Sequence, residues 1–117
     1  MNIEGLRDYC ISKQGVTESF PFDQTTLVFK VMDKIFVLTG IDTFSFINLK
    51  CNPEKAFDLR ENYEGVTGAF HMNKEHWNSV STLGDISDKL IYGWIDDSYD
   101  LIVASLTKKL QTKLENS

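Results

Sequence analysis

The stretch from residue 25 to residue 51 constrains the fold most, because it is patterned as strands while both ends of the chain are patterned as helices. Residues 25–32 and 34–39 are rich in β-branched and aromatic side chains, which favour strands. Asp33 between them predicts a tight hairpin. Residues 44–51 form a third predicted strand, so the chain is expected to be one α+β domain spanning residues 1–117.

The third predicted strand has two different faces, because side chains alternate along a strand. One face is mostly apolar and is formed by Ser45, Ile47, Leu49 and Cys51. The other interleaves aromatic rings with a base and is formed by Phe44, Phe46, Asn48 and Lys50. Such a face is typical of sheets that bind single-stranded nucleic acids, and Lys30 and Lys34 could extend it. A protein contact or partial burial of this face is the competing interpretation.

Helices are predicted on both sides of these strands. Residues 2–12 carry apolar side chains at helical spacing behind a capping Asn2. Asn52 and Pro53 begin a second helix that runs to about residue 63. A short strand near residues 69–70 and another over 77–82 are then expected to pair across an intervening turn.

The tail is predicted to be two helices. Asp85 and Asp88 resemble a capping box at the start of the first. The polar run Asp96-Asp97-Ser98 predicts a joint, after which Ser98 would cap the second helix. Lys108, Lys109 and Lys113 cluster near the end of the chain. They could form a DNA-binding arm, or they could be favoured at a helix C-terminus by its dipole, by ~0.3–1 kcal/mol each.

Charge and cysteine content limit the function classes. Seventeen acidic and twelve basic residues give a net charge of −5, which offers no global attraction to phosphate backbones. No apolar run approaches the ~18 residues that a membrane helix needs, so no membrane partner is expected. Cys10 and Cys51 have no CxxC partner, which suits a reducing compartment. The expected location is therefore the cytoplasm.

Both histidines lie in the stretch from Phe70 to Asn78. His71 and His76 are separated by one residue more than in the inverted zincin pattern, with Glu75 beside His76. The rings could converge on a metal across a turn, or they could make structural hydrogen bonds around it. Because no third ligand lies nearby in the sequence, no metal and no cofactor are expected.

The same stretch offers three further candidate contacts. Asn73 and Lys74 could contact a phosphate from the tip of a turn. The alternative is that Asn73 supports the turn conformation while Lys74 is solvated. Trp77 could stack on a base or a ligand, or it could be a core residue whose indole N–H donates to a carbonyl.

No catalytic motif is present in the sequence. A G-x-S-x-G elbow, a P-loop and a G-x-G-x-x-G loop are all missing. Cys10 lies on the apolar stripe of its predicted helix, with no local feature that would lower its pKa. The chain is therefore expected not to be an enzyme.

The order of several short strings resembles the MmcQ/YjbR family of small bacterial proteins. The strings are Leu6-Arg7-Asp8-Tyr9-Cys10, Phe20-Pro21-Phe22-Asp23, Leu49-Lys50-Cys51-Asn52-Pro53-Glu54, His71-Met72-Asn73-Lys74-Glu75-His76-Trp77-Asn78 and Asp97-Ser98-Tyr99. The most specific part is the family motif formed by His71, Met72, Asn73, Lys74, His76 and Trp77.

This resemblance implies a frataxin-like (CyaY-like) α+β fold, in which N-terminal and C-terminal helices pack on one face of an antiparallel sheet. It also implies a proposed role in DNA binding through a double-wing arrangement of strands. It implies no catalytic residues. The acidic ridge with which frataxins hold iron is not matched, since the first predicted helix has only Glu4 and Asp8.

The sequence therefore predicts a non-enzymatic binding module. DNA is the partner that the resemblance implies, with phosphate contacts from Lys30, Lys34, Lys50 and Lys74, a further contact from Asn73, and stacking or apolar contacts from Phe44 and Phe46. The alternative is a module that binds another protein, a second copy of itself or a small ligand through the same sheet face.

Overall fold

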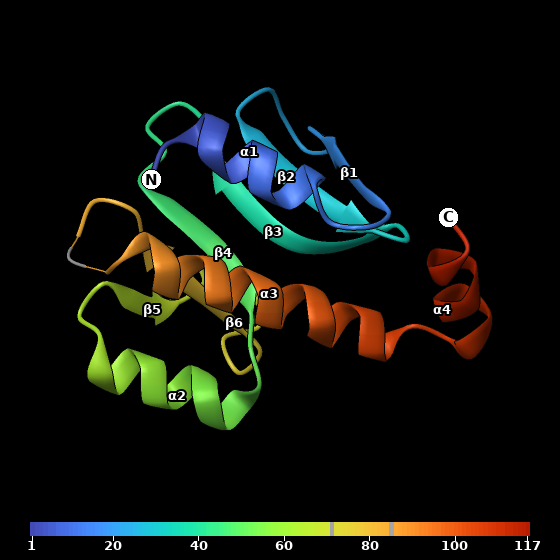
Figure 1. Cartoon of the computed structure of the whole chain (residues 1–117). Helices are drawn as coiled ribbons and strands as arrows, with labels where there is room; N and C mark the ends of the chain where they lie inside the picture. Colours follow the sequence, from blue (N-terminus) through green and yellow to red (C-terminus); the bar gives the residue numbers. More distant parts are fainter. Residues whose placement is uncertain (71, 85) are drawn as a thin grey trace.

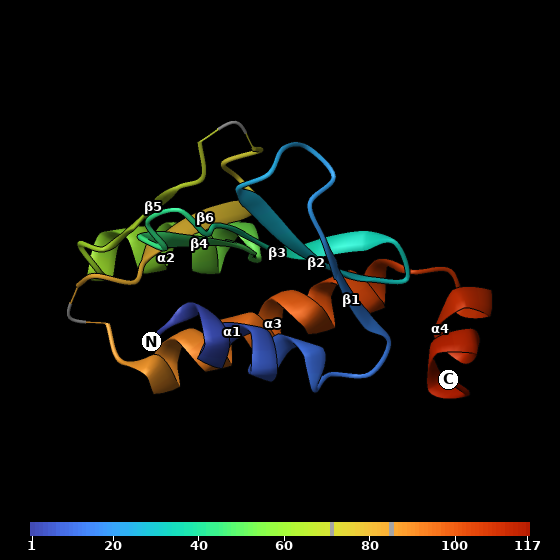
Figure 2. The same cartoon turned by 90° about the horizontal axis from the view of Figure 1, so that it is seen from above.

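An antiparallel sheet and a layer of helices against one of its faces make up the computed structural model, which describes residues 1–70, 72–84 and 86–117 (Figures 1 and 2). The six strands found in these residues lie in the order β1-β2-β3-β4-β6-β5. They are β1 (Val16–Ser19), β2 (Thr26–Val31), β3 (Lys34–Gly40), β4 (Phe46–Lys50), β5 (Val66–Gly68) and β6 (Trp77–Ser81). The helices are α1 (Ile3–Ile11), α2 (Pro53–Asn62), α3 (Asp88–Ser105) and α4 (Lys108–Glu115). The predicted α+β class, with helices on one face, is confirmed.

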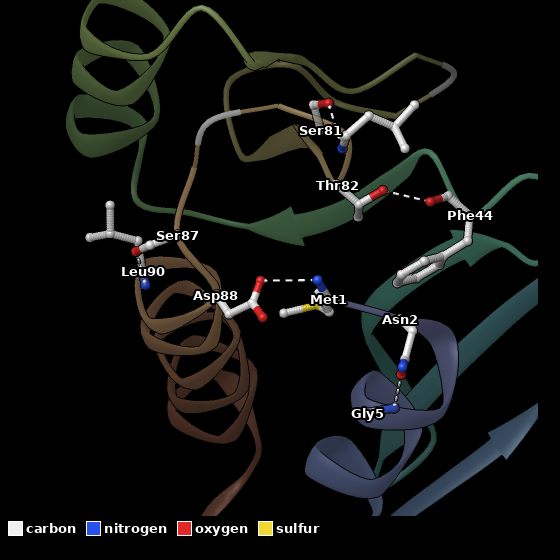
Figure 3. Close-up of polar contacts among 10 residues, drawn as sticks. Met1, Asn2, Gly5, Phe44, Ser81, Thr82, Ser87, Asp88 and Leu90 are labelled. Carbon is white, nitrogen blue, oxygen red and sulfur yellow. Dashed lines mark hydrogen bonds and ion pairs between the residues drawn. The ribbon is translucent and has the colours of Figure 1, made fainter.

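Local sequence signals account for where the helices begin. The side chain of Asn2 accepts a hydrogen bond from the backbone N–H of Gly5 at 2.8 Å, and Asn52 accepts one from Glu54 at 3.0 Å (Figure 3 shows the first). These caps satisfy backbone donors that have no partner within the helix. At the start of α3 the cap is Ser87, which accepts from Leu90. The predicted capping box involves Asp85, which lies outside the described residues.

The hairpin between β2 and β3 forms as predicted. Met32 and Asp33 both have positive φ angles, of 49° and 67°, as a two-residue turn of the hairpin type requires. The strand β1 was not predicted, because it has only four residues and three of them are polar. It pairs antiparallel with β2, with Val16 opposite Val31, and so forms one edge of the sheet. The last predicted pair of strands also forms, although β5 ends at Gly68, just before the predicted Ala69 and Phe70.

The core fills the space between the sheet and α1, α2 and α3. The largest buried side chains come from β2, β3 and β4 on one side and from α1 and α3 on the other. Trp94 on α3 is buried in this core and lies edge-on to Tyr63, with ring centroids 5.2 Å apart. No helix in the described part of the chain is long and apolar enough to cross a membrane.

The predicted joint at Asp96-Asp97-Ser98 is wrong, because α3 runs unbroken through it. Ser98 lies at helical spacing from Trp94 and Ile102, on the buried stripe of α3. Asp96 and Asp97 flank that stripe and bind Lys13 and Lys55 at 2.5 and 2.7 Å respectively. This run of polar residues therefore makes side-chain contacts along the helix and does not end it.

The true joint lies farther along, where Thr107 caps α4 by accepting from Leu110. Lys108 and Lys109 consequently occupy the first turn of α4, where the helix dipole disfavours cations. Their predicted position at a helix C-terminus is wrong, and only Lys113 lies in a last turn. The helix α4 docks on the end of the sheet, where its buried Leu114 meets Gly15 and Val31.

Candidate binding face of the sheet

The face of the sheet that points away from α1 and α3 carries the candidate site. The strand registers align Val28, Leu38, Asn48 and Ser79 across four neighbouring strands of this open face. Two connecting segments rise on the same side: the link between β1 and β2, and the link between β5 and β6 (Figure 2). The sheet is therefore covered by helices on one side and flanked by two links on the other.

A groove of about 570 Å³ lies on the open face. Its volume is in the range of roughly 300–1,000 Å³ that is usual for small-molecule sites. The strands supply Thr26, Ile35, Leu38, Phe46, Asn48 and Ser79, and the two links supply Phe22, Phe70 and Met72. The groove thus has an apolar and aromatic lining with few polar groups, and none of these lining side chains titrates.

Asn48 is the polar group buried in this groove, with 4% of its surface exposed. Its Nδ2 donates to the sulfur of Met72 at 3.4 Å. Because a thioether can only accept, this contact assigns the nitrogen side of the amide. Among the described residues, no donor reaches Oδ1. A buried acceptor without a donor costs about 1–3 kcal/mol.

Phe46 lies on the open face as predicted, but Phe44 does not. Phe44 precedes β4 with a positive φ of 44°, packs against the core and accepts a hydrogen bond from Thr82 through its carbonyl (Figure 3). The strand alternation that placed both rings on one face therefore fails at Phe44. The rings that join Phe46 come instead from Phe22 and Phe70, on the two links.

The lysines that were predicted to contact phosphate do not all lie on one surface. Lys30 is opposite Ile35, which lines the groove, and Lys50 follows Asn48 by two residues on β4, so both lie on the open face. Lys34 is opposite Val31, a core residue, so it lies on the other face. The prediction that Lys34 extends the basic face is therefore wrong.

Lys74 belongs to the link between β5 and β6. Its carbonyl accepts from Arg60 of α2 at 2.9 Å, and its Nζ lies 5.9 Å from the centre of the Phe70 ring. The side chain of Asn73 accepts from the backbone of Glu75 at 2.9 Å, which is the turn-supporting role predicted as one alternative. These contacts tie the link to α2 and to the groove lining.

His76 belongs to no metal site among the described residues. His71 lies outside the described residues. His76 is half-buried, and its carbonyl accepts from the backbone of Cys51 at 2.7 Å. The described residues contain no group of three histidine, cysteine or carboxylate side chains that could hold an ion. Trp77 is half-buried opposite Lys50 on β6.

Charge is divided between the two layers. Within the described strands, Glu18 is the one acidic residue, and it faces α1, where it binds Arg7 at 2.9 Å. The helices carry most of the acidic side chains, including Glu54, Asp58 and Asp97. The strands of the open face thus present Lys30 and Lys50 without a carboxylate, although the chain carries a net charge of −5.

The fold and the groove define a small α+β protein with one covered and one open sheet face. The model of the YjbR family matches residues 11–101. The chain is 33% identical over 110 residues to the uncharacterized protein YjbR of Escherichia coli K12, covering 93% of each chain. It is 38% identical over 96 residues to the uncharacterized protein YbdF of Escherichia coli O157:H7, covering 81% of this chain and 79% of the relative. The chain belongs to the YjbR family.

Solved structures share the fold as well. The crystal structure of the Deinococcus radiodurans protein DR2400 matches with a TM-score of 0.91 and 31% identity, covering 97% of this chain and 88% of that one. A crystal structure of a Pseudomonas syringae protein matches with a TM-score of 0.72 and 32% identity, covering 86% of this chain and 98% of the other. The likeness to frataxin (CyaY) stays a prediction of the resemblance.

Proposed function

We propose that this protein is a non-enzymatic binding module whose open-face groove takes an apolar group of a ligand. The carrying observation is that Phe22, Phe46 and Phe70, from three separate segments, line one groove of about 570 Å³. Exposed apolar surface gathered in this way marks binding sites in soluble proteins. None of the described residues that line the groove has a titratable side chain, which supports binding rather than catalysis. The buried free thiols of Cys10 and Cys51 suit the reducing cytoplasm.

The test is a fluorescence titration with 8-anilinonaphthalene-1-sulfonate, an aromatic probe that brightens in apolar sites. Phe46→Ala should weaken binding about tenfold or more, because the floor of the groove loses a ring. Phe57→Ala is the matched control, since this phenylalanine is 58% exposed on α2 and lines no part of the groove. Absence of binding, or equal losses in both variants, would contradict the proposal.

DNA binding is the second candidate, and the placement of Lys30 and Lys50 favours it. Both lie on the open face, and the described strands add no carboxylate there. Two basic residues make a small phosphate footprint, so any affinity should be modest and salt-dependent. This candidate rests on the lysines, whereas the first rests on the groove.

Anisotropy titrations with random duplex and single-stranded DNA at two salt concentrations test the second candidate. Binding to duplex should fall with a log-log slope of about −0.9 per contacted phosphate. The Lys30→Glu/Lys50→Glu variant should lose binding, while Lys108→Glu/Lys109→Glu changes the charge equally on α4 and should retain it. No binding at low salt would remove DNA and leave the groove to a small molecule or a protein partner.

A further inference from the structure

The unsatisfied oxygen of Asn48 identifies the chemistry of the ligand, on the assumption that the groove binds one as proposed above. This oxygen belongs to a groove residue with 4% of its surface exposed, and no described donor reaches it. The other end of the amide is held by Met72 at 3.4 Å, so the side chain is already oriented. A ligand that brings an N–H or O–H group to this oxygen removes a desolvation cost that the free protein bears.

The shape and lining of the groove favour a flat ring as the carrier of that donor. Aromatic rings stack or meet edge-to-face with other rings at centroid separations of about 4.5–7 Å. Phe22, Phe46 and Phe70 offer such partners, and Met72 adds a polarizable sulfur that favours aromatic contact. The volume of about 570 Å³ suits a small molecule rather than a folded segment.

The charge beside the groove favours an anionic substituent on that ring. Lys30 and Lys50 lie on the open face next to the groove residues Ile35 and Asn48. Among the described residues, neither lysine has a carboxylate within ion-pair distance. The electrostatic complement at the end of the groove near Lys30 and Lys50 is therefore a negative group on the ring. The other end is acidic, because Asp23 accepts hydrogen bonds from the groove residue Thr26.

We propose that the groove binds a small aromatic acid, whose ring N–H or O–H donates to Oδ1 of Asn48 and whose anionic group faces Lys30 and Lys50. In this arrangement Asn48 accepts the hydrogen bond, the phenylalanines pack against the ring, and the lysines favour an anionic ligand.

Two probes that differ only in the donor test the role of Asn48. Indole-3-carboxylate carries a ring N–H, while 1-methylindole-3-carboxylate has the same charge and nearly the same shape without it. Calorimetric titration of the full chain should show about tenfold tighter binding of the N–H acid, the worth of one hydrogen bond of roughly 1.4 kcal/mol. In Asn48→Leu that preference should vanish. Equal affinities in the wild type, or a preference that survives in Asn48→Leu, would overturn the assignment.

The stability of Asn48→Leu separates a binding role from a structural one. Replacing an unsatisfied buried amide by an apolar side chain of similar size should leave the ligand-free protein as stable as the wild type, or more stable. If Asn48 is a binding residue, Asn48→Leu should therefore lose the preference for the N–H acid without losing stability. If the variant does not fold, the side-chain amide resonances of Asn48 in the wild type give the same answer. They should shift with indole-3-carboxylate and stay in place with the methylated acid.

The lysines are tested by Lys30→Gln/Lys50→Gln. This variant should weaken both acids by a similar factor, about fivefold or more, while the preference for the N–H acid persists. Unchanged affinity for both acids would overturn the anionic part of the proposal. Binding of 8-anilinonaphthalene-1-sulfonate without binding of either indole acid would overturn the ligand class and leave the groove as a binding site. Failure of all three probes would also remove the groove as a small-molecule binding site.

Discussion

The hydroxyl of Ser98 donates to the carbonyl oxygen of Phe36 at 2.6 Å, joining the middle of α3 to the centre of the sheet. The hydroxyl oxygen of Ser98 in turn accepts a hydrogen bond from the backbone N–H of Lys50 at 2.9 Å. Phe36 lies at a register shift between β2 and β3, and the β3–β4 register ends at Val37 opposite Leu49. Ser98 therefore serves two backbone groups that these irregularities leave without a strand partner.

Ser98→Ala should lower the free energy of unfolding by about 1–3 kcal/mol, because it leaves a buried carbonyl and a buried N–H without partners. Urea denaturation measures the change. Ser105→Ala removes a hydroxyl that bonds within the same helix, to Ile102, from an exposed position, and should cost less than about 0.5 kcal/mol. Equal effects of the two substitutions would contradict the bridging role.

Gly15→Ala should destabilise the protein by about 1–3 kcal/mol. Gly15 has a φ of +74°, which an L side chain rarely adopts, and an added Cβ would collide with the Leu114 side chain of α4. The matched control is Gly93→Ala in α3, where a Cβ would meet nothing within 4 Å. That control should stabilise the helix by about 0.5–1 kcal/mol. Urea denaturation should therefore give opposite signs, and equal signs would contradict this account.

Tyr9 should ionise only in strong alkali. Its hydroxyl donates to Asp96 at 2.7 Å, and this hydrogen bond together with burial raises the pKa of Tyr9 from 10.0 to about 12. The folded state holds the phenolic proton more tightly, so this stabilisation is fully present below about pH 10 and is lost as pH rises toward 12.

The stability difference between the wild type and Tyr9→Phe isolates this effect from other titrating groups. The advantage of the wild type should be larger at about pH 8 than at about pH 11. Absorbance of tyrosinate during an alkaline titration should show fewer phenols ionising near pH 10 in the folded wild type than after unfolding, because the pKa of Tyr99 is raised as well as that of Tyr9. A difference that does not change with pH would contradict the coupling to Asp96.

Neither cysteine should react readily in the folded protein. Burial raises the pKa of the Cys10 thiol to about 12 and also raises that of Cys51, and only the thiolate is nucleophilic. Labelling with a disulfide reagent should be slow for both, with Cys51 reacting first because it retains 7% exposure while Cys10 has none. Cys51→Ser assigns the two phases. Fast labelling of Cys10 in native buffer would contradict its burial.

Features governed by neighbouring residues could be predicted from the sequence. The caps Asn2 and Asn52 and the turn at Asp33 depend on a few adjacent positions, and all three form. Ser98 was misinterpreted because a serine after two aspartates has the same local pattern as a helix cap. Its actual role depends on a register shift in β3, which no pattern within α3 encodes.

The candidate site could be predicted only in part. Phe46 and Asn48 were placed on one face by strand alternation, and the groove confirms that placement. Phe44 was predicted to lie with them because the strand alternation was extended two residues too far. The strand β4 begins only at Phe46, and Phe44 has a positive φ that breaks the alternation. Phe22 and Phe70 could not be brought to the groove from the sequence, because their links meet only through the arrangement of six strands. The sequence feature that could have pointed to Phe22 and Phe70 is that each is a large aromatic residue within a segment that connects two strands.

The strands of the open face carry two lysines and no carboxylate, whereas the described helices carry most of the acidic side chains, so charge is distributed unevenly over the molecule. Far from the protein, its net charge of −5 repels a polyanion, but salt screens that repulsion beyond about 8 Å. Within that distance the nearest side chains decide the sign, so the strands of the open face, with Lys30 and Lys50, should repel a polyanion less than the acidic helices do. The protein should therefore orient as it approaches a charged surface, and its retention on an ion exchanger should follow the facing layer more than its isoelectric point.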